Sequence, residues 1–225
     1  MKWLDSIKED AEVIFLMGDL FDFWFEYKHV VPKGFTRFLG KLAELSDNGI
    51  RLIIFTGNHD MWMYDYFCQE LGAELYNGPK DYQINERKLH IGHGDGLGPG
   101  DHGYKFLKKI FQNRFCRFLF GRVMHANLGM FLGNKWAGHS WQKHDKTGDN
   151  YTYQGPEHEL LFKYCEEIET KRHYDYYVFG HRHYKLQLNV GAAGAQYLNL
   201  GDWIVFDSYA VFDGHELKLM DYKGF

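Results

Sequence analysis

Residues 13–22 read VIFLMGDLFD, an apolar run that ends at Gly18 and is followed by Asp19 and then by Asp22. An apolar run of this length is typical of a strand buried on both faces and is short for a helix. A glycine at the end of such a strand allows a sharp turn, so the next side chain stands at the carboxyl edge of a sheet. We therefore expect Asp19 to lie at a ligand-binding edge of an α/β fold.

Three later segments repeat the pattern of an apolar run, a glycine and then a residue that can bind metal: GNHD at 57–60, GHGD at 92–95 and GHRH at 180–183. Asp, Asn and His supply oxygen and nitrogen donors without any thiolate, which suits Mn, Fe, Zn or Co. Two such cations bridged by a carboxylate lower the pKa of a shared water and hold both oxygens of a phosphoryl displacement. The candidate metal ligands are Asp19, which would be the bridge, Asn58, His93, His181 and His183.

His59 follows Asn58 directly, so we expect its ring to face a substrate rather than the metals. There it would protonate a leaving oxygen or stabilise developing charge. Asp22 would orient the imidazole, in an acid and histidine pair without a nucleophile. The plain alternatives are a turn cap for Asp22 and core or surface positions for the histidines.

Composition places the chain among globular proteins. It has 225 residues, an apolar share of 45% and a net charge of -4, which fits one domain. Its three cysteines form no Cys-x-x-Cys pattern, so we expect a reducing, cytoplasmic location. No apolar stretch approaches the ~18 residues of a membrane span.

Basic residues are concentrated in one segment. Between Asp101 and Asp145 there are eight lysines and arginines and no acidic residue. Large apolar residues interleave with them, which predicts one or two amphipathic helices inserted beside the site as a lid. Such a face is either merely solvated or binds an anion on a lipid surface. The acidic remainder of the chain argues against a nucleic-acid partner, because it would repel a long polyanion.

Apolar periodicity predicts alternating strands and helices, as in a layered α/β protein. After residue 184 the pattern changes to short strands separated by turns, which indicates antiparallel hairpins, with Asp213-Gly214 as one turn. We expect helices at 35–48, 63–71 and 156–171. The expected strands lie at 13–17, 51–56, 74–76, 82–85, 88–91, 176–179, 185–190, 197–200, 203–206, 209–212 and 217–222.

The four motifs, in this order, resemble those of the calcineurin-like metallophosphoesterase superfamily. Within it, the segments GDLFDFW at 18–24, HGDGL at 93–97 and LGDW at 200–203 resemble the UDP-2,3-diacylglucosamine diphosphatases of bacterial lipid A synthesis. The resemblance covers nearly the whole chain. It implies a single domain over residues 1–225, an α/β/β/α sandwich of two mixed sheets, with a helical lid inserted at about residues 102–150.

The resemblance also implies roles for individual residues. Asp19 would bridge two Mn ions, Asn58, His93 and His181 would bind one of them, and His183 would bind the other. Substrate contacts would come from Asn58, His59, Asp101, Tyr104 and Lys143, with Asp101 on the sugar. The best-known members carry an arginine where this chain has His59.

The superfamily begins with a strand that ends in Asp-x-His, which supplies the remaining ligands of the second metal. No such motif precedes Val13. We expect a first strand upstream of Met1, with Met1 as a misassigned start or a truncation. On this expectation the second metal site is incomplete in the 225 residues.

The function implied is hydrolysis of UDP-2,3-diacylglucosamine to UMP and 2,3-diacylglucosamine 1-phosphate. The enzyme would act on this lipid-linked nucleotide sugar in the cytoplasm, peripherally on the inner face of the inner membrane. Two alternatives stay open: a phosphodiesterase that acts on another nucleotide or phospho-substrate, and a catalytically impaired form that binds metal or lipid.

Overall fold

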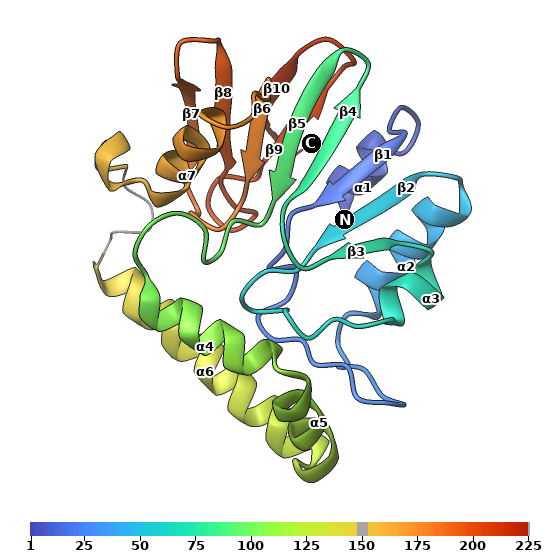
Figure 1. Cartoon of the computed structure of the whole chain (residues 1–225). Coiled ribbons are helices and arrows are strands. Elements are labelled where there is room, and N and C mark those ends of the chain that lie inside the picture. The colour runs from blue at the N-terminus through green and yellow to red at the C-terminus, as the bar shows by residue number, and fades with distance from the viewer. Residues whose placement is uncertain (148–152, 225) are drawn as a thin grey trace. The chain divides into compact units, whose positions relative to one another are not determined.

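The computed structural model describes residues 1–147 and 153–224, with the backbone alone for residues 139–147. It is an α/β protein, as expected (Figure 1). The helices are α1 (Lys2–Ile7), α2 (Thr36–Asp47), α3 (Tyr66–Leu71), α4 (His102–Gln112), α5 (Arg114–Val123), α6 (Ala126–Thr147) and α7 (Leu160–Glu169), with a 3-10 turn η1 (Pro156–His158). The strands are β1 (Val13–Leu16), β2 (Arg51–Phe55), β3 (Glu74–Tyr76), β4 (Lys80–Ile84), β5 (Arg87–Gly92), β6 (Tyr176–Phe179), β7 (Lys185–Val190), β8 (Ala195–Leu200), β9 (Ser208–Phe212) and β10 (Leu217–Asp221).

The described residues form two compact units. Of the described residues, unit 1 contains 1–77, 106–141 and 224, and unit 2 contains 78–105, 142–147 and 153–223. The four motifs are divided between them, with Asp19 and the 57–60 segment in unit 1 and the two histidine segments in unit 2. The assignment of residues 1–225 to a single domain stays a prediction.

Unit 1 is built on a parallel three-stranded sheet in the order β1-β2-β3. Helices α2 and α3 connect its strands, as in βαβ units. The carboxyl ends of β1 and β2 therefore lie side by side, because Leu16 pairs with Ile54 at the end of the register. This pairing brings the segment after β1 to the segment after β2.

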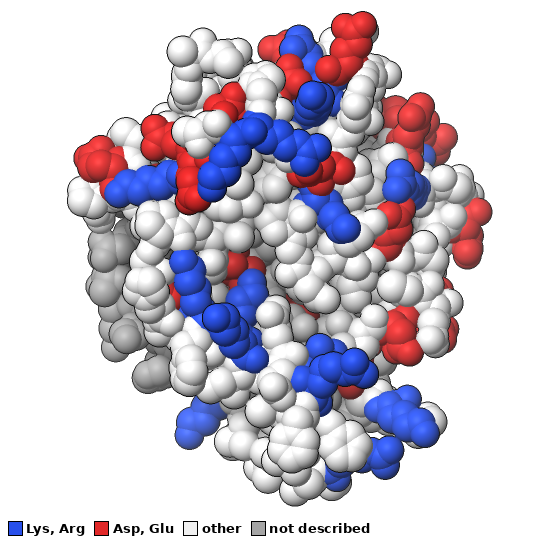
Figure 2. All heavy atoms as spheres, viewed as in Figure 1, with Lys and Arg blue, Asp and Glu red and all other residues white. Residues whose placement is uncertain are grey.

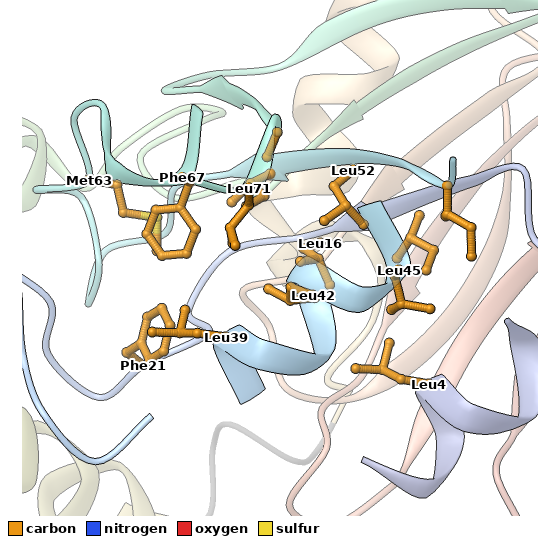
Figure 3. Close-up of a cluster of buried hydrophobic side chains, with 14 of the residues drawn as sticks. Leu4, Leu16, Phe21, Leu39, Leu42, Leu45, Leu52, Met63, Phe67 and Leu71 are labelled. Carbon is orange, nitrogen blue, oxygen red and sulfur yellow. The ribbon is translucent and has the colours of Figure 1, made fainter. Parts of the chain in front are cut away.

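The core of unit 1 lies between α2 and this sheet. Leu42 and Leu45 of α2 are fully buried, and they recur at a helical spacing that points them at the strands. Figure 3 shows them with Leu16 of β1 and Leu52 of β2. This packing holds β1 and β2, and so the two motif-bearing loops, in one place.

Unit 2 contains a mixed five-stranded sheet in the order β4-β5-β6-β8-β7. Its three central strands are parallel, and β4 and β7 pair antiparallel at the edges. Helix α7 packs its buried Leu161, Phe162 and Cys165 into the same core as Tyr177 and Phe179 of β6. Since β5 and β6 are parallel neighbours, the two histidine segments that follow them share one sheet edge.

The first sheet is wholly parallel, whereas two mixed sheets were expected. The antiparallel pairing expected in the C-terminal tail is confirmed for β9 and β10, which form a hairpin of their own. Residues 203–206 are a turn and not a strand, because one carboxylate oxygen of Asp202 accepts the backbone N–H groups of Ile204, Val205 and Phe206. The predicted turn at Asp213-Gly214 does connect β9 to β10.

The basic segment is helical, as expected, but it forms three helices, α4, α5 and α6, rather than one or two. Helix α5 is capped by Asn113, whose side chain accepts the backbone N–H groups of Phe115 and Cys116. Figure 2 shows lysines and arginines gathered where Figure 1 draws α4 and α5. Across the described ranges, no helix is both long and apolar enough to cross a membrane.

Candidate metal and phosphoester site

In unit 1, the backbone holds Asp19 against the segment that follows β2. Its Oδ1 atom accepts a hydrogen bond from the backbone N–H of His59 at 2.9 Å. A Cβ atom added to Gly57 would lie 2.1 Å from the same oxygen, so only glycine admits the carboxylate at this distance. The loop that carries Asp19 and the loop that carries Asn58 therefore lie next to each other, while the role of Asn58 as a metal ligand stays a prediction.

His59 is held by a main-chain atom. Its Nδ1 lies 3.0 Å from the backbone oxygen of Asp22, and its own carbonyl oxygen accepts the backbone N–H of Trp24. The structure thus brings together the two residues expected to form a catalytic pair. The contact it gives uses the carbonyl of Asp22, while the exposed carboxylate of Asp22 is not the group hydrogen-bonded to Nδ1.

Asp60 connects the two loops of unit 1. It is completely buried, and its two carboxylate oxygens accept the backbone N–H groups of Gly57 at 2.6 Å and of Leu20 at 2.7 Å. Hydrogen bonds to a charged acceptor are strong, and two of them here link the loop after β1 to the loop after β2. The sequence places Asp60 in a motif but gives it no role, because only the fold shows which backbone groups it faces.

In unit 2, the rings of His93 and His181 lie next to each other, with their centroids 5.1 Å apart at an angle of 68°. The backbone N–H of Gly180 donates to the carbonyl oxygen of His93 at 3.0 Å, which ties the two segments together. The buried side-chain amide of Asn199 donates to the carbonyl oxygen of Gly180. The structure therefore brings together two of the predicted nitrogen ligands.

His183 has a carboxylate partner that the sequence analysis did not assign. Nδ1 of His183 lies 3.4 Å from Oδ2 of Asp202. Burial alone would raise the pKa of Asp202, but His183 and the backbone N–H groups of residues 204–206 lower it below its usual value. Metal-binding histidines usually have such a carboxylate partner, which sets the tautomer and the ring orientation. The only signal in the sequence is the Gly201-Asp202 pair that follows a strand.

Several predicted site residues have an unusual backbone conformation. Asp19, Asp101, His181 and His183 all have φ values between 48° and 64°, in the left-handed region that residues other than glycine rarely occupy. Each such residue costs on the order of 1–3 kcal/mol, and strain of this kind clusters at functional sites. Asn85 and Asp207, which were given no role in the site, also have positive φ values, so this conformation does not by itself mark a ligand.

Two further residues predicted to contact the substrate, Asp101 and Tyr104, have described side chains. Asp101 is exposed, and its carbonyl oxygen accepts the backbone N–H of Lys105. The hydroxyl of Tyr104 donates to Oδ2 of the buried Asp95. The side chain of Lys143 lies outside the described residues.

Comparisons with known proteins give relatives along most of the chain. The sequence is 37% identical to a UDP-2,3-diacylglucosamine hydrolase of Porphyromonas gingivalis over 96% of this chain and 86% of that protein. It is 28% identical to a protein of the same name from Ectopseudomonas mendocina, over 90% of this chain and 81% of that protein. No family model matches the sequence.

Solved structures similar to this chain include an archaeal phosphodiesterase, with 11% identity over 98% of this chain and 90% of that one and a TM-score of 0.45. Vps29 from Entamoeba histolytica, with zinc, has 13% identity over 97% of this chain and 79% of that one and a TM-score of 0.40. The family assignment rests on the sequence relatives and not on these structures. With 37% identity across nearly its whole length, the chain belongs to the UDP-2,3-diacylglucosamine hydrolase family.

Proposed function

We propose that this hydrolase cleaves the pyrophosphate bond of UDP-2,3-diacylglucosamine and releases UMP and 2,3-diacylglucosamine 1-phosphate. The observation that carries the proposal is the 37% identity to a relative of that name over 96% of the chain. The four motifs add chemical support, because each places oxygen or nitrogen donors directly after a strand of a parallel pair. Water supplies the new oxygen on phosphorus, and the bridging oxygen leaves with the departing phosphate.

We propose that Asp19, Asn58, His93 and His181 bind one divalent cation and that His183, with Asp19 shared, contributes to a second. The donor set fits such a centre, since it offers carboxylate, amide and imidazole groups and no thiolate. Manganese is the metal that we propose, on the resemblance of the motifs. When bound, the cations would polarise the phosphoryl oxygens and lower the pKa of the attacking water.

His59 is the proposed general acid. Its Nδ1 is anchored on the carbonyl oxygen of Asp22, which fixes the plane of the ring. A proton on Nε2 would then pass to the oxygen of the leaving phosphate, or stabilise its charge by a hydrogen bond. An arginine, as the best-known members carry here, could serve only the second of these purposes, because it does not give up its proton near neutral pH. His59 supplies a positive charge only when it is protonated.

Substrate recognition is assigned to Asn58, His59, Asp101, Tyr104 and Lys143. Asp101 is exposed and can accept hydrogen bonds from sugar hydroxyls. The hydroxyl of Tyr104 already donates to Asp95, so we propose that its ring makes the contact with the substrate.

The lipid-linked substrate would be reached at a membrane surface on the cytoplasmic side. Helices α4, α5 and α6 expose large apolar side chains beside their lysines and arginines, among them Phe106, Phe115, Phe118 and Phe131, all more than half exposed. Exposed apolar side chains next to basic ones favour a peripheral position on an anionic membrane.

The test is hydrolysis of UDP-2,3-diacylglucosamine in detergent micelles by the purified chain with added Mn²⁺, with UMP measured by chromatography. We expect UMP release by the parent chain and its loss in the His181→Ala variant, while the exposed Arg37→Gln control stays active. Cleavage of a generic phosphodiester without release of UMP would assign another substrate. Binding of metal with no hydrolysis of either compound would favour a binding protein.

His59 is tested by two substitutions. We expect His59→Ala to lower kcat by about 10²–10⁴-fold, the range of a general acid. His59→Arg should be impaired as well, because arginine does not give up its proton near neutral pH. Full activity in His59→Arg would assign charge stabilisation to this position in place of proton transfer. Equal kcat values in all three proteins would remove His59 from the mechanism.

A further inference from the structure

A pocket lies in unit 1 apart from every motif residue. Its volume is about 610 Å³, within the range of small-molecule sites. Three parts of the chain line it: residues 25–29, Tyr64, and helix α5 with Arg114. We call it the arginine pocket.

The charged lining is strongly basic. Arg114, Arg117, Arg122 and Lys28 face the pocket. No carboxylate among the described side chains forms an ion pair with any of these four groups. Three guanidinium groups brought together without acidic partners favour an anionic ligand.

Glu26 is the acidic residue of the pocket, but its carboxylate is already occupied. It is buried, with 6% of its surface exposed. Its Oε2 accepts three backbone N–H groups, those of residues 64, 65 and 66, and its Oε1 accepts the indole N–H of Trp24. The role of Glu26 is to hold the loop that carries Tyr64, so its charge is compensated there and does not neutralise the arginines.

The rest of the lining is aromatic. Phe25, Tyr27, Tyr64 and Phe118 all contribute to the pocket. The guanidinium of Arg117 lies over the Tyr64 ring, 3.9 Å from its centroid, and its Nε donates to the Tyr64 hydroxyl at 2.9 Å. This contact fixes α5 to the loop after β2 and gives the pocket a rigid wall.

We propose that the arginine pocket binds an organic phosphate, with the phosphate on the guanidinium groups and its apolar or aromatic part against the rings. Arginine matches phosphate geometry because its planar fork donates two parallel hydrogen bonds. The aromatic walls add an apolar surface that inorganic phosphate would not use. All residues that line the pocket belong to unit 1, and binding of an organic phosphate there does not depend on the hydrolytic reaction.

Two kinds of molecule carry such an organic phosphate: a nucleotide and the headgroup of an anionic lipid. The test is isothermal titration of the full chain, treated with EDTA, with UMP, with dihexanoyl phosphatidic acid below its micellar concentration, and with inorganic phosphate. We expect at least one organic phosphate to bind about tenfold more tightly than inorganic phosphate, and the tighter ligand identifies the source.

Arg114→Gln and Arg122→Gln each change an exposed residue and are expected to leave the fold intact. Each should weaken binding of the organic phosphate about tenfold, the loss expected for a charged hydrogen bond. The control is Arg37→Gln, an exposed arginine on α2 outside the pocket, which should bind as the parent does.

Two results would overturn the inference. One is that neither organic phosphate binds more tightly than inorganic phosphate. The other is that binding is unchanged in both α5 variants but lost in His181→Ala, which would place the phosphate with the motif residues. Release of UMP from UDP-2,3-diacylglucosamine by the α5 variants is measured in parallel, so failure of the pocket and failure of the hydrolase are separate results.

Discussion

Oδ2 of Asp202 lies 3.4 Å from Nδ1 of His183, and the other oxygen of the same carboxylate accepts the backbone N–H groups of the turn that follows it. Asp202 therefore orients the ring of His183 from a position that the turn itself makes rigid. A carboxylate on one ring nitrogen leaves the other nitrogen to bind a metal and raises its basicity.

The Asp202→Asn variant should bind Mn²⁺ about 10–100-fold more weakly, the usual loss when such a partner is removed. Asparagine keeps an oxygen for the turn but can present its amide nitrogen to His183. The dissociation constant is measured by calorimetry, together with the melting temperature. A fall in melting temperature with an unchanged dissociation constant would restrict Asp202 to a structural role.

Gly57→Ala should impair Mn²⁺ binding by displacing Asp19. The new methyl group would lie 2.1 Å from Oδ1 of Asp19 and 2.6 Å from its backbone nitrogen, closer than any real contact allows. We expect at least a tenfold loss of affinity for Mn²⁺, since the carboxylate must move.

The matched control is Gly40→Ala. Gly40 lies inside α2, and apart from its chain neighbours and the adjacent backbone of the helix no atom lies within 4 Å of the added methyl group. Because glycine is unfavourable inside a helix, this variant should gain about 0.5–1 kcal/mol in free energy of unfolding and bind Mn²⁺ normally. Equal metal binding by both alanine variants would show that the close approach of Gly57 to Asp19 is not needed.

Asp60→Asn should destabilise unit 1. The buried carboxylate accepts two backbone N–H groups, and asparagine can accept only one of them while its amide faces the other. The expected loss in free energy of unfolding is about 2–3 kcal/mol, or roughly 5–10 °C in melting temperature for a chain of this size. Asp47→Asn, at an exposed position on α2, serves as the control. A melting temperature equal to that of the control would contradict the assigned role.

His90 should make the stability of unit 2 dependent on pH. Burial lowers the pKa of His90, although Asp81, at 2.7 Å from Nδ1, acts to raise it. Below about pH 6.5 the unfolded chain binds a proton at this residue more readily than the folded chain does. The free energy of unfolding therefore decreases as the pH is lowered. The contribution is present above that pH and is lost as the pH decreases.

This is measured by urea unfolding between pH 8 and pH 5, with His90→Gln as the comparison. The variant is expected to be less stable at pH 8, because His90 also contacts the hydroxyl of Tyr164 at 3.0 Å. Its stability should nevertheless change less with pH than that of the parent. Parallel pH curves for the two proteins would show that His90 is not the group responsible.

Local patterns predicted most of the secondary structure because they depend on neighbouring residues. The apolar runs before Gly18, Gly57, His93 and His181 are strands, and the periodic stretch that contains Leu42 is α2. The prediction of a strand at residues 203–206 was wrong, and the cause is local as well. There the carboxylate of Asp202 competes successfully for backbone N–H groups that a strand would have used.

By itself, the sequence determined the order of the four motifs, the types of their donor atoms and the strand that precedes each one, since all of these are properties of short segments. Tertiary structure decided which groups complete them. Asp60 joins its loop to that of Leu20, and Asp202 supports His183. Arg117 and Tyr64 together form one wall of the arginine pocket. These partners are separated along the chain, and only strand pairing and helix packing bring them within hydrogen-bonding distance.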